Sequence, residues 1–145
     1  MMSINKLSQE VIDIINRQTT IVVVATVDED GSPRTAPFGW VYAKDSGTLR
    51  LSMSRSHDTY KNIVRDRRVM VCLMEEGNIA ISIKGTAQVC KEQLNVRGHC
   101  AMVEVDIKDV KSDVTSVASV IQGIKCKINE RYVEITNNVY TEMIE

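Results

Sequence analysis

Short runs of β-branched and alternating residues, separated by tight-turn sequences, constrain the fold of this chain more than any other feature. Three turn sequences, EDGS at 29–32, KDSG at 44–47 and EEGN at 75–78, divide its first half. Gly, Asp, Asn and Ser favour turns, and turns this short join antiparallel strands. The sequence therefore predicts a mainly β protein with antiparallel strands, a small closed or sandwiched barrel with helices on its flank.

The expected strands differ in pattern. Residues 19–28, TTIVVVATVD, are nearly continuous in apolar and β-branched residues, as in a strand buried on both faces, and residues 19–43 are predicted to form a hairpin. Alternation in TLRLSMS places Leu49, Leu51 and Met53 on one face and Arg50, Ser52 and Ser54 on the other. Further strands are expected at 68–74, 79–90 and 100–113, with Gly85 marking a bulge or a close backbone approach.

Helical spacing occurs in three segments. The first, 7–18, has Ser8 as its expected N-cap, and the last, 129–145, has Asn129. For the middle segment, 58–66, the pattern predicts Asp58 or Thr59 as N-cap and a buried stripe of Tyr60, Ile63 and Val64. Residues 112–123 are expected to form a loop, and residues 124–128, IKCKI, a short last strand.

Composition places the chain among ordinary globular proteins. Its 145 residues predict a single domain, 1–145, and its net charge of -1 offers no global basic field for nucleic acid or an anionic membrane. The four cysteines form no Cys-x-x-Cys pair, and the first residues do not resemble a signal peptide. We expect a cytoplasmic protein with reduced thiols and without a membrane partner.

The stretch SMSRSHDTYKN, 52–62, is the strongest candidate for chemistry. It combines a hydroxyl face at a strand end, the cations Arg55 and Lys61, and the predicted start of a helix, whose unpaired N–H groups favour an anion. Capping residues on a solvated helix would have the same composition. From the residues alone, a helix cap and an anion pocket both stay open.

The order of motifs from Thr20 to Gln88 resembles the pyridoxamine 5'-phosphate oxidase-like, FMN-binding split-barrel family. The resemblance lies in a strand leading into ATVDEDGSP, a second strand with a proline and aromatic residues, a third strand ending in serines, and a helix beginning with a basic residue and Asn. Residues 79–89, IAISIKGTAQV, continue it with a strand that has a central glycine. It implies a six-stranded antiparallel Greek-key split barrel that forms a homodimer, with FMN at the dimer interface.

The resemblance also implies the residues that hold the cofactor. Segment 37–40 corresponds to the strand whose backbone meets the flavin ring, Ser52 and Ser54 to the hydroxyl-bearing strand end, and Lys61 and Asn62 to the phosphate-binding helix start. With their neighbours, the expected cofactor-binding residues are Pro37, Phe38, Gly39, Trp40, Ser52, Met53, Ser54, Arg55, Tyr60, Lys61 and Asn62. Trp40 has a second interpretation, because a lone strand tryptophan often packs in a core or an interface.

Two departures from the family pattern limit the functional expectation. Tyr60 stands where the family often has arginine, and no Arg-x-His pair follows Gly98, although the oxidase subgroup uses one to hold its substrate. Oxidation of pyridoxamine phosphate is therefore not expected. We expect an FMN-dependent oxidoreductase with an unknown small substrate. The alternatives are a non-catalytic or stress-related flavin-binding protein, or a relative that binds haem or a deazaflavin.

Other candidate sites are weaker. His99 and Cys100 lack further ligands at matching spacing, so no metal site is expected. Cys72 and Cys126 are interpreted as inert core residues on apolar strands. Residues 65–69, RDRRV, could contact a phosphate, but an exposed helix end explains them more simply.

Overall fold

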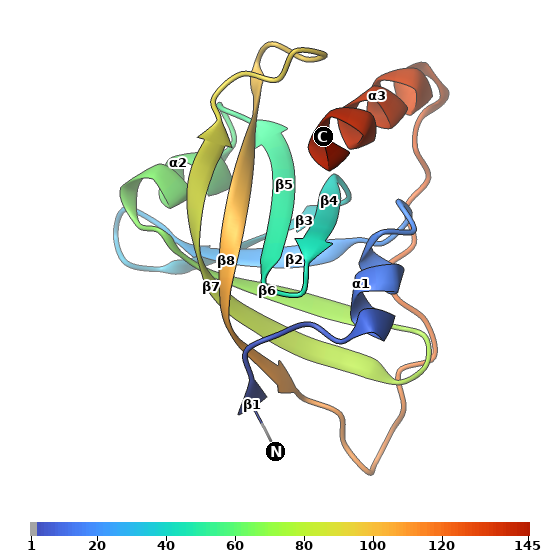
Figure 1. The fold of residues 1–145 in the computed structure, drawn as a ribbon. Helices are drawn as coiled ribbons and strands as arrows, with labels where there is room; N and C mark the ends of the chain where they lie inside the picture. The colour runs from blue at the N-terminus through green and yellow to red at the C-terminus, as the bar shows by residue number, and fades with distance from the viewer. Residues whose placement is uncertain (1–2) are drawn as a thin grey trace.

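A computed structural model describes residues 3–145 of the chain, and Figure 1 shows its fold as a curved antiparallel sheet with helices around it. The elements follow in the order β1 Ser3–Ile4, α1 Gln9–Ile15, β2 Val22–Val27, β3 Pro33–Phe38, β4 Val41–Asp45, β5 Thr48–Ser54, α2 Asp58–Arg65, β6 Arg68–Glu75, β7 Ile79–Lys91, β8 Cys100–Ser112, η1 Glu130–Tyr132 and α3 Val133–Ile144.

The sheet runs in the order β3-β2-β6-β7-β8-β5-β4, with β1 attached to β8 beside this path. All pairings are antiparallel, as the tight turns predicted. The expected number of strands was six, whereas the path has seven. The edge strands β3 and β4 follow each other in the chain but are not hydrogen-bonded neighbours in this order, so the barrel is split between them.

The predicted hairpin of residues 19–43 is shorter in the structure. β2 pairs with β3 from Val22 opposite Phe38 to Val27 opposite Pro33, while β4 pairs with β5. Strand pairing changes at Gly39 and Trp40. The residues before this point form the edge strand β3 and the residues after it form the edge strand β4, on the two sides of the split.

Gly85 lies where the register of β7 against β8 shifts, as expected for a bulge. A Cβ at this position would come within 2.6 Å of the Asp106 carbonyl oxygen and of the Val105 side chain. Real Cβ atoms do not approach other atoms this closely, so the long strands β7 and β8 can curve past each other here because residue 85 is glycine.

Helix α2 differs from its prediction at both its cap and its buried face. His57, not Asp58 or Thr59, is the N-cap, and its Nδ1 accepts a hydrogen bond from the Thr59 N–H at 3.1 Å. The buried residues are Thr59, Asn62 and Ile63, whereas Val64 is 59% exposed. Asn62 takes the place of an apolar residue because its amide hydrogen-bonds to groups of β2 and the following turn.

The carboxyl-terminal strap, residues 113–129, connects β8 to η1 and α3. In Figure 1 it leaves the lower end of β8 and returns along the outside of the molecule to the side where α3 lies beside β4. The predicted strand at 124–128 was wrong: this segment has no regular secondary structure and pairs with no strand. Cys126 lies in the strap and is exposed, so its interpretation as a core residue was also wrong.

Two apolar clusters stabilise the fold. The larger fills the barrel and includes α1, and the smaller lies under α3, where Val139, Tyr140 and Met143 meet Leu94, Cys100 and Met102. Trp40 packs against this second cluster. Burial of each of these side chains contributes roughly 1.5–3 kcal/mol, so α3 is an integral part of the barrel's wall.

Candidate functional site

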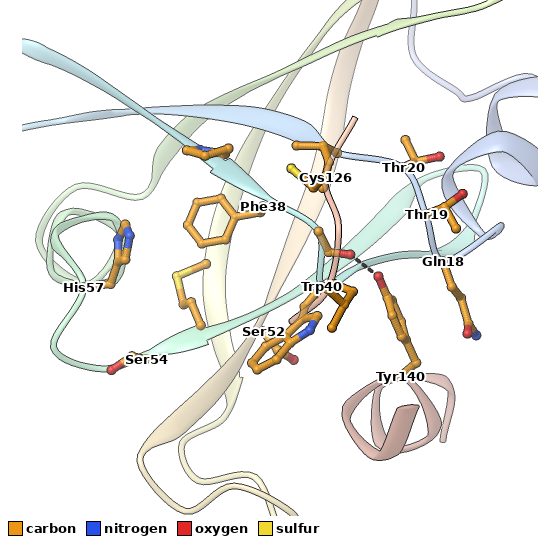
Figure 2. A pocket seen from close by; sticks show the side chains of 15 residues that line it. Gln18, Thr19, Thr20, Phe38, Trp40, Ser52, Ser54, His57, Cys126 and Tyr140 are labelled. Carbon is orange, nitrogen blue, oxygen red and sulfur yellow. Dashed lines mark hydrogen bonds between the residues drawn. The ribbon is translucent and has the colours of Figure 1, made fainter. Parts of the chain in front are cut away.

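A pocket of about 370 Å³ lies at the split in the barrel. Figure 2 shows that its lining side chains come from the α1–β2 connection, the ends of β3 and β5, the strap and α3. This volume lies within the usual range for small-molecule sites, which are mostly apolar with a few polar groups. The lining residues are Gln18, Thr19, Thr20, Ile21, Pro37, Phe38, Gly39, Trp40, Ser52, Met53, Ser54, His57, Cys126, Ile128 and Tyr140.

Among the described residues that line the pocket, Ser52 has a side-chain hydroxyl that is buried without a hydrogen-bond partner. Ser52 is 1% exposed, and its Oγ has no hydrogen-bond partner among the described residues. A buried hydroxyl without a partner costs roughly 1–3 kcal/mol. Most buried polar groups in native proteins have a hydrogen-bond partner, so this hydroxyl in the pocket wall is a candidate partner for a bound molecule or water.

The neighbouring Ser54 lies at the end of the same strand. Its Oγ lies 2.9 Å from the Ser56 Oγ and accepts a hydrogen bond from the Ser56 N–H at 3.3 Å. Burial alternates along β5 from Thr48 to Leu51, but Ser52 is buried as well, on a strand that α3 contacts. The two hydroxyls therefore lie on one side of β5, one enclosed and one at the start of α2.

The corner between β3 and β4 is held from two directions. The Tyr140 hydroxyl donates a hydrogen bond to the Gly39 carbonyl, drawn as a dashed line in Figure 2. Burial of Tyr140 raises its pKa to about 12, so this donor keeps its proton at neutral pH. A Cβ on Gly39 would lie 3.0 Å from the Ile21 side chain, which favours glycine at this corner.

On the other side, Phe38 and His57 have ring centroids 5.4 Å apart in a tilted arrangement. The His57 Nδ1 accepts a hydrogen bond from the Thr59 N–H, which holds the ring beside Phe38. No Lys, Arg, Asp or Glu belongs to the lining set of the described chain. The lining therefore contains no carboxylate, ammonium or guanidinium group.

Helix α3 is fixed in place by a buried carboxylate. Glu142 accepts hydrogen bonds from the N–H groups of Asn95 and Val96 and pairs with the Lys91 Nζ at 2.6 Å. Burial alone would raise the Glu142 pKa, but these hydrogen bonds outweigh it and lower the pKa. The Arg50 guanidinium also donates to the Met143 carbonyl at 2.7 Å, near the negative end of the helix dipole.

The structure brings together most of the expected cofactor-binding residues. Seven of them line the pocket: Pro37, Phe38, Gly39, Trp40, Ser52, Met53 and Ser54. Trp40 combines both of its interpretations, since it lines the pocket and packs against the cluster under α3.

The other four lie outside the pocket lining. The Arg55 guanidinium donates to the carbonyls of Glu92, Gly98 and Cys100, which ties the β7–β8 loop to β5. Tyr60 is half-buried against the barrel core, and Lys61 is exposed.

Asn62 is buried, and its amide is fully engaged within the fold. The Nδ2 donates to the Thr26 Oγ1 at 3.0 Å and to the Asp28 Oδ1 at 2.8 Å, while the Oδ1 accepts from Arg65 at 3.0 Å. The hydrogen bonds of Asn62 thus connect α2 to β2 and to the turn that follows it.

Several lining residues were absent from the sequence-based prediction. Gln18 to Ile21 enter from the α1–β2 connection, where Gln18 has a φ of 66°. Cys126 and Ile128 come from the strap and Tyr140 from α3. The helical spacing of residues 129–145 was the one sequence signal that involved Tyr140. The position of the strap depends on contacts between residues that are distant in sequence.

Among residues 3–145 no group of three or more His, Cys, Asp or Glu is arranged to hold a metal ion. His99 is exposed, and burial raises the pKa of the Cys100 thiol. No described helix is long and apolar enough to cross a membrane.

A family model described as pyridoxamine 5'-phosphate oxidase matches residues 7–117, which is most of the chain. The chain belongs to the pyridoxamine 5'-phosphate oxidase-like family. This match confirms the resemblance found in the motifs from Thr20 to Gln88 and extends it to α1 and β8. No curated protein sequence matches the chain.

Solved structures share this fold. A candidate pyridoxamine 5'-phosphate oxidase from Lactobacillus delbrueckii superposes with a TM-score of 0.66 at 24% identity, covering 77% of this chain and 100% of its own. HupZ from Group A Streptococcus gives a TM-score of 0.64 at 19% identity, covering 83% of this chain and 99% of its own. An F420 reductase gives 0.59 at 13% identity, covering 68% and 94%. At these identities the comparisons establish the split-barrel fold and leave ligand and activity to the site itself.

Proposed function

We propose that this protein binds FMN in the pocket at the barrel split and acts as an oxidoreductase on a small substrate. The observation that carries the proposal is the unpartnered Oγ of Ser52, 1% exposed, in the wall of a mostly apolar pocket. A flavin ring system needs such a combination, because it has flat apolar faces and hydrogen-bonding atoms along its edges.

The residues present fit the ring of the cofactor. Phe38, Trp40 and Met53 provide apolar surface, and the Ser52 hydroxyl provides a donor or acceptor for a ring edge. Tyr140 holds the Gly39 carbonyl in place, which fixes the position of the backbone at the corner between β3 and β4.

The phosphate requires a different environment, since no lysine or arginine side chain lines the pocket. We assign it to the region just outside, where Ser54 and Ser56 precede α2 and Lys61 is exposed in the first turns of that helix. Hydroxyls, helix N–H groups and a lysine together are a common anion site. Because the Asn62 amide is engaged with Thr26, Asp28 and Arg65, this assignment depends on Lys61 and the serines.

A second copy of the chain would complete the site. β3 is an edge strand, and its residues Pro33 to Thr35 and Pro37 are exposed beside the pocket. Unpaired edges usually bind another element or are protected by charge. We therefore propose a homodimer in which the partner covers the open side of the split.

When bound, flavin supplies hydride and electron transfer, so the protein need supply only orientation and shielding from water. The pocket lining contains no lysine or arginine that could hold the phosphate of pyridoxamine phosphate. Together with the missing Arg-x-His pair, this argues for a substrate other than pyridoxamine phosphate.

The activity is tested on the FMN-reconstituted protein under anaerobic conditions with NADH and NADPH. We expect the visible flavin bands to bleach with one nucleotide and to return when an electron acceptor or air is admitted. Flavin that stays oxidised with both nucleotides and with dithionite-reduced dyes would contradict oxidoreductase function and favour a protein that only stores FMN.

A further inference from the structure

The lining of the pocket has two origins. Gln18 to His57 lie within the family-matched residues 7–117, and they include all lining residues expected to hold the cofactor. Cys126, Ile128 and Tyr140 lie beyond that match and come from the strap and α3. The shared part of the wall therefore corresponds to a cofactor, and the added part is free to serve a substrate that differs between family members.

The strap enters the pocket with a strict alternation. Cys126 and Ile128 belong to the lining, while the intervening Lys125 and Lys127 do not. Successive side chains that point to opposite sides would produce this pattern. A shift of the strap by one residue would bring lysines to the pocket in place of apolar side chains.

Contacts with the β6–β7 turn set this register. The Val120 carbonyl accepts from the Asn78 N–H and the Val120 N–H donates to the Asn78 Oδ1, both at 3.0 Å. The Gly123 N–H donates to the Glu75 Oε1 at 3.0 Å, and a Cβ on Gly123 would lie 2.6 Å from the Met74 carbonyl oxygen. The strap is thus seated on β6 at a position that only glycine permits.

The wall of the pocket lacks the side chains that carry a permanent charge at neutral pH. The Tyr140 hydroxyl donates to the Gly39 carbonyl, and the lining contains no Lys, Arg, Asp or Glu. A carboxylate or phosphate that entered would lose its hydration without gaining an ionic partner, which is strongly unfavourable.

We propose that Cys126, Ile128 and Tyr140 form the substrate-facing wall of the pocket, and that this wall admits small uncharged molecules and excludes anions. The inference rests on the proposed function, because it takes the pocket as the place where a substrate meets the cofactor. It adds the chemical class of the substrate and the residues that select it.

Two probes of nearly equal shape, 2-naphthamide and 2-naphthoate, differ in charge at neutral pH. Their binding to the FMN-saturated protein, measured by calorimetry, should differ at least tenfold in favour of the amide. Equal affinities, or no binding of 2-naphthamide up to its solubility limit, would overturn the proposal.

A pair of matched variants locates the selection. Ile128 and Ile124 lie on the same strap and are 44% and 45% exposed, but Ile124 lies outside this pocket. Ile128→Lys should lower the amide-to-acid affinity ratio at least tenfold, and Ile124→Lys should leave it unchanged. An equal change in both variants would show a general charge effect and contradict a selective wall.

Alkylation of Cys126 by iodoacetamide gives a readout that does not depend on flavin. 2-Naphthamide should slow alkylation of Cys126 while leaving the exposed Cys90, which lies outside the pocket, unaffected. If the protein takes up no FMN but 2-naphthamide still protects Cys126 and still binds more tightly than 2-naphthoate, the proposed function is wrong and the proposed substrate-facing wall is supported. If FMN binds but Cys126 is not protected, the wall is wrong and the proposed function stands.

Discussion

At the scale of single residues, Ser52 has a buried hydroxyl whose partner is missing from the described chain. Ser52→Ala should therefore have opposite effects with and without ligand. Without FMN, the free energy of unfolding in urea should stay level or rise by up to about 1 kcal/mol, because an unsatisfied group is removed. With FMN, affinity should fall roughly tenfold, about 1.4 kcal/mol, through loss of a hydrogen bond.

Thr59 provides the comparison for this variant. Its Oγ1 is also buried without a partner among residues 3–145, but Thr59 does not line the pocket. The free energy of unfolding of Thr59→Val should equal or exceed that of the parent protein, and its affinity for FMN should be unchanged. A Ser52→Ala protein with unchanged FMN affinity would remove Ser52 from the site.

Lys61 is the cation that we assign to the FMN phosphate. Lys61→Ala should weaken FMN binding by about 1–3 kcal/mol, roughly tenfold to over a hundredfold, through loss of a charge-assisted contact. The loss should shrink at high salt, because Lys61 is exposed. Lys84→Ala, on an exposed position of β7 outside this pocket, is the control and should change nothing. Equal affinities of the Lys61 variant and the parent would place the phosphate elsewhere.

Sequence reasoning at this scale worked where a local period decides the outcome. The alternation of β5 correctly placed Ser52 and Ser54 on one face. It could not reveal that Asn62 bonds to Thr26 and Asp28, 36 and 34 residues away, or that the Arg55 donors go to backbone carbonyls of the β7–β8 loop. Such partners depend on the assembled barrel.

At the scale of elements, α3 depends on Glu142 for its attachment. Glu142→Gln removes the charge that pairs with Lys91 and leaves one of two backbone N–H groups without its acceptor. We expect a loss of about 1.5–3 kcal/mol in unfolding free energy at pH 7. Urea titration measures it, and Glu134→Gln, an exposed position in the same helix, should have little effect.

The pH dependence follows from the sign of the shift. The Glu142 pKa is lower in the folded protein than its ordinary value of 4.5. Its contribution is therefore complete above about pH 4.5 and is lost as the pH falls through the lower folded pKa. The stability difference between the parent and Glu142→Gln should be constant from pH 7 to pH 5.5 and decrease below pH 4.5. A difference that does not change with pH would mean that the carboxylate charge is not involved.

Elements were predictable to the extent that their signals are local. Turn sequences located the hairpins, and Ser8 caps α1 as expected, accepting from the Val11 N–H. The strap was predicted wrongly, because IKCKI alternates as a strand does but pairs with no strand. The strap's hydrogen bonds to Asn78 and Glu75 near the β6–β7 turn come from Val120 and Gly123, which precede this segment. A strand needs a free edge beside it, and sequence alternation cannot supply that information.

At the scale of the whole molecule, the site exists because two consecutive strands, β3 and β4, end up on opposite edges of one curved sheet. The order of turns predicted an antiparallel barrel, and the family resemblance predicted that it is split. The pocket wall formed by the strap and α3 could not be predicted, because these segments lie outside the region that carries the family resemblance.

The proposed homodimer belongs to this scale. Size-exclusion chromatography with light scattering should give twice the chain mass of 16.3 kDa. Because the partner would complete the pocket, FMN should shift the equilibrium further toward the dimer. A monomer that holds FMN with full affinity would show that one chain makes the entire site.

The most direct test of the account is a titration of the purified, cofactor-free protein with FMN, coenzyme F420 and haemin, followed by gel filtration and visible spectroscopy. The account predicts that FMN alone is retained at one molecule per chain, with a shifted flavin spectrum. Retention of haemin or F420 without FMN, or a colourless protein after all three, would contradict it.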